Sequence, residues 1–259
     1  MHCAMEATPA LARRDLMRLG GLAALGTMLP ASLARAASGP ELLANVARVI
    51  ESWVGPGKFP GMVAALGLPG QETHYVSRGV EGFTDADAVT PDSLFRIYSM
   101  TKPVTGMATM MLIEQGRLGL DQPLADILPK YAKMQVQVTP DGPVDQLRPA
   151  KTPITIRQLL THTSGLGYTI IQQGPIKAAM EAQGLVAGQI SRMPVPGLDR
   201  GKAVPSIELF ADRLADIPLV YEPGTKWSYS LGLDLLGRVI EVVSGKPFDR
   251  FLAEHLFEP

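Results

Sequence analysis

The sequence predicts an α+β fold in which helices pack on a sheet. A hairpin pattern lies near the amino terminus, and amphipathic helical patterns fill most of the remaining chain. Of the 259 residues, 46% are hydrophobic and 19% are charged, so a sizeable core is available. Strands that gather early and helices that follow favour a helical layer on a sheet.

The expected sheet begins with two short strands. Residues 61–68 form an apolar run, residues 73–80 alternate in polarity, and Pro69-Gly70 supplies the turn between them. A helix at residues 41–54 precedes them and ends at the turn residues 55–57. Because two strands alone do not make a stable sheet, we expect further strands. No convincing strand pattern follows, so the sheet is expected to be incomplete in this chain.

The remaining chain is predicted to be mainly helical. Helical patterns occur at residues 99–116, 156–160, 176–187, 206–214, 231–243 and 247–256. Residues 129–153 are polar and dotted with prolines, with a little strand expected around 134–138.

Composition argues against several classes of function. The formal net charge is −1 and no basic run occurs, which disfavours nucleic-acid binding. Cys3 is the only cysteine, so no disulfide framework and no cysteine-based metal site is expected. The four histidines lack the spacing of metal ligands. We therefore expect no cofactor and no metal.

Residues 1–36 are expected to lie outside the folded domain. Arg13-Arg14 precedes an apolar segment, Leu19–Leu29, that is too short to span a bilayer comfortably, and Ala34-Arg35-Ala36 offers a cleavage site. This pattern resembles a bacterial twin-arginine export signal. An ordinary amphipathic helix is a weaker interpretation, because polar residues are missing from one face. We expect a periplasmic or secreted protein without a stable membrane anchor after cleavage.

Ser99-Met100-Thr101-Lys102 is the strongest candidate for chemistry. A serine needs a base to become a nucleophile, and a lysine three residues later lies on the same helical face. Residues 104–113 are uncharged, and apolar surroundings disfavour the ammonium form of lysine. Pro103 places Ser99 at the helix mouth, where free N–H groups, including that of Ser99, could hold an oxyanion. The alternative is a capping serine with a solvated lysine.

Three segments together carry a family resemblance. Residues 95–102 (FRIYSMTK) resemble the nucleophile segment of β-lactamase-related serine hydrolases, and residues 154–166 (ITIRQLLTHTSGL) resemble an internal segment of that family. Residues 223–231 (PGTKWSYSL), followed by Leu235-Leu236-Gly237 and Ser244-Gly245, are similar to its tyrosine segment. The family includes class C β-lactamases, D-alanyl-D-alanine carboxypeptidases, D-aminopeptidases and penicillin-binding-protein-like esterases. The likeness covers residues 41–259.

The resemblance implies a β-lactamase/transpeptidase-like fold, with an antiparallel sheet flanked by helices and a helical subdomain. It implies that Ser99 is the acylated nucleophile, Lys102 its general base or proton shuttle, and Tyr229 the partner that moves the proton. A phenol beside an ammonium releases its proton more readily, which suits that role. His162 is the natural base of a competing Ser–His hydrolase, but no Gly-x-Ser-x-Gly elbow occurs. The resemblance gives His162 the task of holding a turn.

Two departures from the family pattern affect the expected substrate. Lactamases and carboxypeptidases of the family have Tyr-x-Asn, and Leu231 stands here in place of the asparagine. Loss of that amide favours esters over β-lactams and peptides, and lactamase-like esterases carry the same Tyr-Ser-Leu. The family's third motif, Lys-Thr-Gly or an equivalent, is missing. We therefore expect a chain that lacks the carboxyl-terminal strands and the third motif.

The sequence thus favours an exported serine hydrolase that acts on carboxylic esters through an acyl-enzyme on Ser99. One alternative is a β-lactamase or a D-Ala-D-Ala-type peptidase. Another is a non-catalytic truncated fragment or pseudoenzyme, which the missing third motif supports. The expected partner is a small-molecule ester or amide substrate, and the sequence does not set the oligomeric state.

Overall fold

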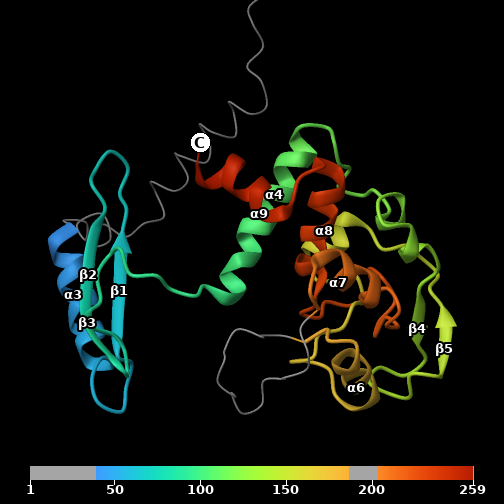
Figure 1. Cartoon of the computed structure of the whole chain (residues 1–259), viewed down its shortest axis with the longest axis horizontal. Helices are drawn as coiled ribbons and strands as arrows, with labels where there is room; N and C mark the ends of the chain where they lie inside the picture. Colours follow the sequence, from blue (N-terminus) through green and yellow to red (C-terminus); the bar gives the residue numbers. More distant parts are fainter. Residues whose placement is uncertain (1–38, 187–203, 259) are drawn as a thin grey trace, which may run out of the picture. The chain divides into compact units, whose positions relative to one another are not determined.

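The computed structural model describes residues 39–186 and 204–258. The chain divides into two compact units, residues 1–96 and residues 97–259, which are traced in Figure 1. The expected export signal at residues 1–36 lies outside the described residues. No helix in the described ranges is both long and apolar enough to cross a membrane.

The first unit is a helix packed on a small antiparallel sheet. Helix α3 (Gly39–Trp53) contacts strands β1 (Gly61–Leu66) and β2 (His74–Gly82), which pair from Gly61↔Gly79 to Leu66↔His74. The predicted helix and hairpin are therefore confirmed. A third strand, β3 (Asp85–Ala88), extends the sheet in the order β1-β2-β3. The sequence does not reveal β3, because its four residues are all exposed and lack an apolar face.

The second unit is mainly helical, and its longer helices agree with the predicted ranges (Figure 1). A short 3₁₀ turn, η1 (Tyr98–Met100), leads directly into α4 (Thr101–Glu114). Helix α8 (Gly232–Ser244) contacts α4, α5, α7 and α9 and is the centre of the packing. The other helices are α5 (Ile156–Leu160), α6 (Gly174–Ala182), α7 (Ile207–Leu214) and α9 (Phe248–Leu252), and the turns are η2 (Leu124–Asp126), η3 (Pro129–Lys133) and η4 (Ala253–Phe257).

The core of this unit is built on one face of α8. Leu235, Leu236, Val239 and Ile240 have no solvent exposure, at the spacing that an amphipathic helix requires. The helix ends at Gly245, whose φ of +72° is the left-handed conformation common after helices. The apolar stripe of α8 therefore fixes the position of its first turn, which carries part of the candidate site.

Helix α4 buries one side, at Thr105, Ala108 and Leu112. Its other side carries Met107 and Met110, which are 52% and 46% exposed. The uncharged run seen in the sequence thus supplies apolar side chains to both sides of the helix.

The proline-dotted stretch contains a second, two-stranded sheet. Strand β4 (Gln135–Gln137) matches the little strand expected around residues 134–138, and it pairs with β5 (Leu147–Pro149), which was not expected. The helix expected at residues 176–187 begins two residues earlier and ends at Ala182, and residue 187 lies outside the described residues. The carboxyl-terminal helix is interrupted, because α9 gives way to a π-helical turn at Ala253.

Candidate active site

Ser99 lies in the turn that precedes α4, with its side chain exposed. Tyr98, immediately before it, has a φ of +46°, a left-handed conformation that costs a non-glycine residue about 1–2 kcal/mol. Pro103 is the third residue of α4, where a missing N–H breaks no hydrogen bond within the helix. The helix therefore begins just after Ser99, as the sequence predicts.

Lys102 lies one turn after Ser99, among aromatic rings. Its Nζ is 4.9 Å from the ring centroid of Tyr229 and 5.7 Å from that of Tyr168. Both distances are within the range of a cation–π interaction. None of the ion pairs found within residues 39–186 and 204–258 includes Lys102. Its ammonium is thus held by rings and not by a direct carboxylate contact.

Tyr229 reaches the nucleophile from a segment 130 residues away. Its hydroxyl donates a hydrogen bond of 2.7 Å to Ser99 Oγ. The structure therefore brings together the three residues that the sequence singled out: Ser99, Lys102 and Tyr229. A hydroxyl, an ammonium and a phenol in such proximity can exchange a proton.

The position of Tyr229 depends on His162. The backbone N–H of Ser230 donates to His162 Nδ1 at 3.1 Å, and the rings of His162 and Tyr229 have centroids 4.7 Å apart. Burial lowers the pKa of His162 from 6.5, and the Lys102 charge acts in the same direction. The imidazole is thus neutral at pH 7, which leaves Nδ1 free to accept. His162 positions the tyrosine, in agreement with the turn-holding role expected of it.

The turn that carries His162 is fastened to the tyrosine segment by backbone contacts. The N–H of Ser228 donates to the His162 carbonyl at 2.9 Å, and that of Val220 donates to the Gly165 carbonyl at 2.8 Å. Gly165 has a φ of +82°, and a Cβ there would lie 2.0 Å from the Tyr221 carbonyl oxygen. Only glycine fits this approach, which explains the Ser-Gly of the internal segment.

Tyr168 is a site residue that the sequence analysis missed. It is only 8% exposed, and its ring centroid lies 5.5 Å from that of Tyr229. Burial raises the pKa of Tyr168 to about 12, and the charges of Asp234 and Tyr229 contribute further. Tyr168 therefore stays protonated at neutral pH. Its only sequence signal is its place two residues after the end of the internal segment.

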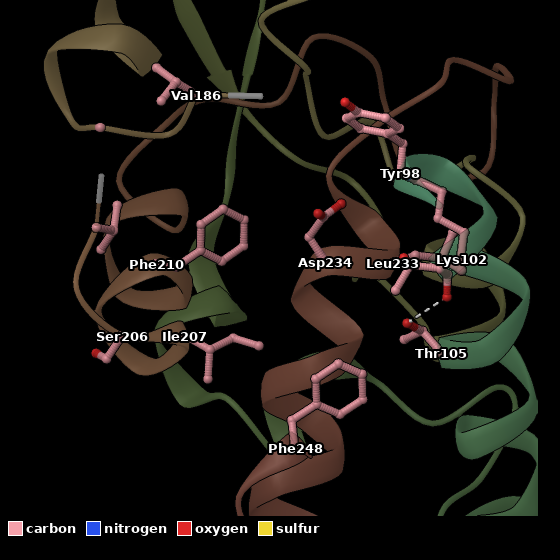
Figure 2. Close-up of a pocket in the computed structure, with 13 residues that line it drawn as sticks. Tyr98, Lys102, Thr105, Val186, Ser206, Ile207, Phe210, Leu233, Asp234 and Phe248 are labelled. Carbon is pink, nitrogen blue, oxygen red and sulfur yellow. Dashed lines mark hydrogen bonds between the residues drawn. The ribbon is translucent and has the colours of Figure 1, made fainter. Parts of the chain in front are cut away.

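A pocket opens beside Lys102, with a volume of about 440 Å³. Figure 2 shows side chains of α7, α8 and α9 projecting into it. Its walls are largely apolar, and Asp234 is the carboxylate among them. The lining residues are Tyr98, Thr101, Lys102, Thr105, Gly184, Val186, Val204, Ser206, Ile207, Phe210, Leu233, Asp234 and Phe248.

Leu231, two residues after Tyr229, is only 3% exposed and belongs to the core. Its side chain packs in the core and is not among the residues that line the pocket beside Lys102. The site therefore has no side-chain amide at the place where Tyr-x-Asn members of the family carry one.

Comparison with known proteins extends these observations. Residues 46–259 match the family model Beta-lactamase. Esterase EstB of Burkholderia gladioli is 33% identical to this chain over a stretch that covers 72% of the chain and 42% of EstB. Penicillin-binding protein 4 of Amycolatopsis lactamdurans is 32% identical over a stretch that covers 77% of the chain and 42% of that protein. The solved structure of EstCE1, described as a hydrolase with promiscuous acyltransferase activity, is 27% identical, with a TM-score of 0.63 over 84% of this chain and 51% of that chain.

These matches also show how much of such a protein is present. The chain spans about four-tenths of the length of the curated relatives and about half of the matched structure. Within that span it shares their α+β fold of the β-lactamase/transpeptidase type. The matched range contains Ser99, Lys102 and Tyr229, so the chain belongs to the β-lactamase family of serine hydrolases and related proteins.

Proposed function

We propose that this protein hydrolyses carboxylic esters through an acyl-enzyme formed on Ser99. The observation that carries the proposal is the 2.7 Å hydrogen bond between Tyr229 and Ser99 Oγ, with Lys102 Nζ beside the same ring. A hydroxyl in this setting has a route for its proton, which a serine nucleophile requires. The esterase and hydrolase named among its relatives support the same reaction.

In the proposed reaction, Ser99 Oγ attacks the ester carbonyl carbon and its proton passes to the Lys102–Tyr229 pair. The Ser99 backbone N–H stabilises the oxyanion of the tetrahedral intermediate. When the carbon–oxygen bond to the alcohol breaks, the same pair returns the proton to the leaving oxygen. Water then attacks the acyl carbon and releases the acid, with Ser99 protonated again.

The pocket and Leu231 support esters with an apolar group as substrates. Ile207, Phe210, Leu233 and Phe248 give the pocket much of its apolar surface, which suits an apolar acyl or alcohol group. Leu231 is buried, so it provides no amide to orient a peptide or a β-lactam side chain. A preference for esters over amides is therefore expected.

A fluorophosphonate probe and p-nitrophenyl butyrate test this function together. We expect one probe molecule per chain on Ser99, turnover of the ester, and neither in Ser99→Ala. A folded wild-type chain that neither reacts with the probe nor hydrolyses the ester would favour the non-catalytic alternative.

Acylation by a penicillin is the second candidate function, favoured by the similarity to penicillin-binding protein 4. It requires stable labelling of Ser99 by a fluorescent penicillin, or rapid loss of the penicillin by hydrolysis. Ester turnover without either reaction excludes it.

We further propose export to the periplasm or beyond, which rests on Arg13-Arg14 and the apolar segment that follows. Replacement of both arginines by lysine is expected to retain the protein in the cytoplasm of a bacterial host. An unchanged distribution between cytoplasmic and exported fractions would rule out this signal.

A further inference from the structure

The pocket beside Lys102 lies along the first turns of two helices that begin at the candidate site. Lys102 and Thr105 line it from the first two turns of α4, and Leu233 lines it from the first turn of α8. These two helices pack against each other. Helix α8 begins three residues after Tyr229, whose hydroxyl donates to Ser99 Oγ. The pocket therefore begins beside the residues that flank the nucleophile and extends away from them along α4.

Two side chains from other helices, Ile207 of α7 and Phe248 of α9, form the wall of this pocket one turn further along α8. A Cβ placed on Gly237 would lie 2.6 Å from Ile207 Cδ1 and 3.3 Å from Phe248 Cδ1, so both side chains rest on this glycine. Gly237 follows Gly232, the first residue of α8, by five positions, which is a rise of about 7–8 Å. Figure 2 shows Ile207 and Phe248 across the pocket from Tyr98. This wall therefore limits the pocket on the side away from the nucleophile turn.

An apolar wall of this kind converts the length of a substrate chain into a difference in rate. A methylene group that leaves water for an apolar surface improves binding by about fourfold. A methylene group that meets a filled wall gains nothing and must displace a side chain. Ile207 and Phe248 are each half-buried, and part of each side chain faces the pocket. Chains that end before this wall are therefore expected to gain rate with each added methylene, and longer chains to lose it.

We propose that the pocket holds the chain of the acyl group, and that Ile207 and Phe248, packed on Gly237, set the length of chain that it accepts. This inference rests on the proposed function, because it describes the acyl part of the same ester substrate. The acyl group stays attached to Ser99 through both halves of the reaction, so an apolar surface that begins beside the nucleophile turn serves it throughout. The alcohol leaves after the first half, and the exposed Ser99 side chain gives it a path to solvent.

Packing between helices is the competing explanation for this wall. Helices α7 and α9 both contact α8, and Ile207 and Phe248 meet it at Gly237. A role in packing alone predicts that truncation of either side chain lowers the rate for every ester by a similar factor. The ratio of the rates for a long and a short acyl chain cancels such a common loss and isolates the specificity.

The experiment compares kcat/KM for p-nitrophenyl octanoate with kcat/KM for p-nitrophenyl butyrate in each variant. In Ile207→Ala and Phe248→Ala we expect the octanoate-to-butyrate ratio to rise by at least about fourfold, the gain from one further buried methylene. In Gly237→Ala we expect the ratio to fall, because the new Cβ displaces the Ile207 side chain toward the open space of the pocket. Leu209→Ala shortens a side chain of α7 that does not line the pocket, and its ratio is expected to equal that of the wild type.

A second series of esters separates the acyl chain from the alcohol chain. For ethyl butyrate and octyl butyrate, the ratio of kcat/KM values in Ile207→Ala and Phe248→Ala is expected to match that of the wild type. A change in this alcohol series that equals or exceeds the change in the acyl series overturns the assignment of the pocket to the acyl group.

The remaining outcomes test the wall itself. An unmoved acyl ratio in Ile207→Ala or Phe248→Ala, a rise in Gly237→Ala, or an equal rise in Leu209→Ala overturns the proposal and leaves the proposed function intact. A folded wild-type chain that hydrolyses none of these esters overturns the proposed function, and this inference with it. If an alanine variant of the wall does not fold, Ile207→Val or Phe248→Leu shortens the same side chain, and an unmoved acyl ratio there overturns the proposal equally.

Discussion

At the scale of single residues, the candidate site depends on a phenol that meets a serine from 130 residues away. Tyr229 and Tyr168 lie side by side, but only Tyr229 contacts Ser99 Oγ, and Tyr168 stays protonated with a pKa of about 12. The two tyrosines therefore have different roles, although both rings face Lys102.

This difference leads to a matched pair of variants. Tyr229→Phe removes the proton-transfer partner and is expected to lower ester turnover by about 10²–10⁴-fold. Tyr168→Phe keeps the ring under Lys102 and is expected to lower turnover by far less. Steady-state kinetics with p-nitrophenyl butyrate measures both. Equal losses in the two variants would mean that the rings act only through packing.

The lowered pKa of His162 predicts that the folded protein loses stability in acid. Its pKa is lowered in the folded protein, so the neutral form contributes stability that is fully present above pH 6.5 and is lost as the pH falls through the folded pKa. Protonation also removes Nδ1 as the acceptor of the Ser230 N–H.

His162→Asn keeps an acceptor, tolerates the φ of +56° and cannot be protonated. In urea unfolding at pH 7.5 and pH 5, we expect the wild type to lose more stability on acidification than this variant. The other histidines are the same in both proteins, so the difference between the two losses reports the change at position 162. An identical loss in both would remove His162 as the cause.

The burial of Leu231 predicts how the protein responds when the asparagine of Tyr-x-Asn family members is introduced at this position. Because this side chain is buried in the core, Leu231→Asn places an amide among apolar groups and is expected to cost about 2 kcal/mol or more of stability. Labelling by a fluorescent penicillin is expected not to increase. A variant that is as stable as the wild type and gains penicillin labelling would show that the side chain faces the substrate.

At the scale of elements, the sequence predicts the bounds of a helix best where an apolar pattern and its start or stop signals coincide. Helix α5 has the predicted bounds, because a Thr155–Gln158 capping box opens it and both backbone and side-chain bonds of the box are made. Helix α8 combines an apolar stripe with Gly245. Strands β3 and β5 are short and partly or wholly exposed, so they lack the period-two pattern that reveals a strand.

The same reasoning explains which site residues were predicted. Ser99, Lys102 and Tyr229 belong to motifs with recognisable spacing or resemblance. Tyr168 and Asp234 acquire their surroundings only from tertiary packing, one on a loop and the other on α8. No local pattern distinguishes them from an ordinary buried tyrosine or a first-turn aspartate.

Substitution of Gly165 tests whether the backbone of the internal segment must lie this close to the Tyr221 carbonyl. Gly165→Ala is expected to cost more than the 1–2 kcal/mol typical of a left-handed alanine, because its Cβ would also meet the Tyr221 carbonyl oxygen. Gly116→Ala is the control, since Gly116 has a φ of +69° and open space around its Cβ position. Denaturant unfolding measures both costs. Equal costs would mean that the turn moves aside freely.

At the scale of the whole molecule, every group assigned to the candidate site lies in the second unit, residues 97–259. The first unit supplies the three-stranded sheet and α3. The chain spans about four-tenths of the length of its curated relatives. A test of the proposed activity is therefore most direct when it reads the reaction of Ser99 itself. That chemistry needs only the hydroxyl, the Lys102–Tyr229 pair and an electrophile.

The most direct measurement is therefore the intact mass of the protein after treatment with a fluorophosphonate. We expect one adduct per chain, located on Ser99 by peptide mapping, formed rapidly in the wild type and at least about 10²-fold more slowly in Lys102→Met. A folded wild-type chain without an adduct, or an adduct that forms equally fast without the lysine amine, would contradict the assignment of Ser99 as an activated nucleophile.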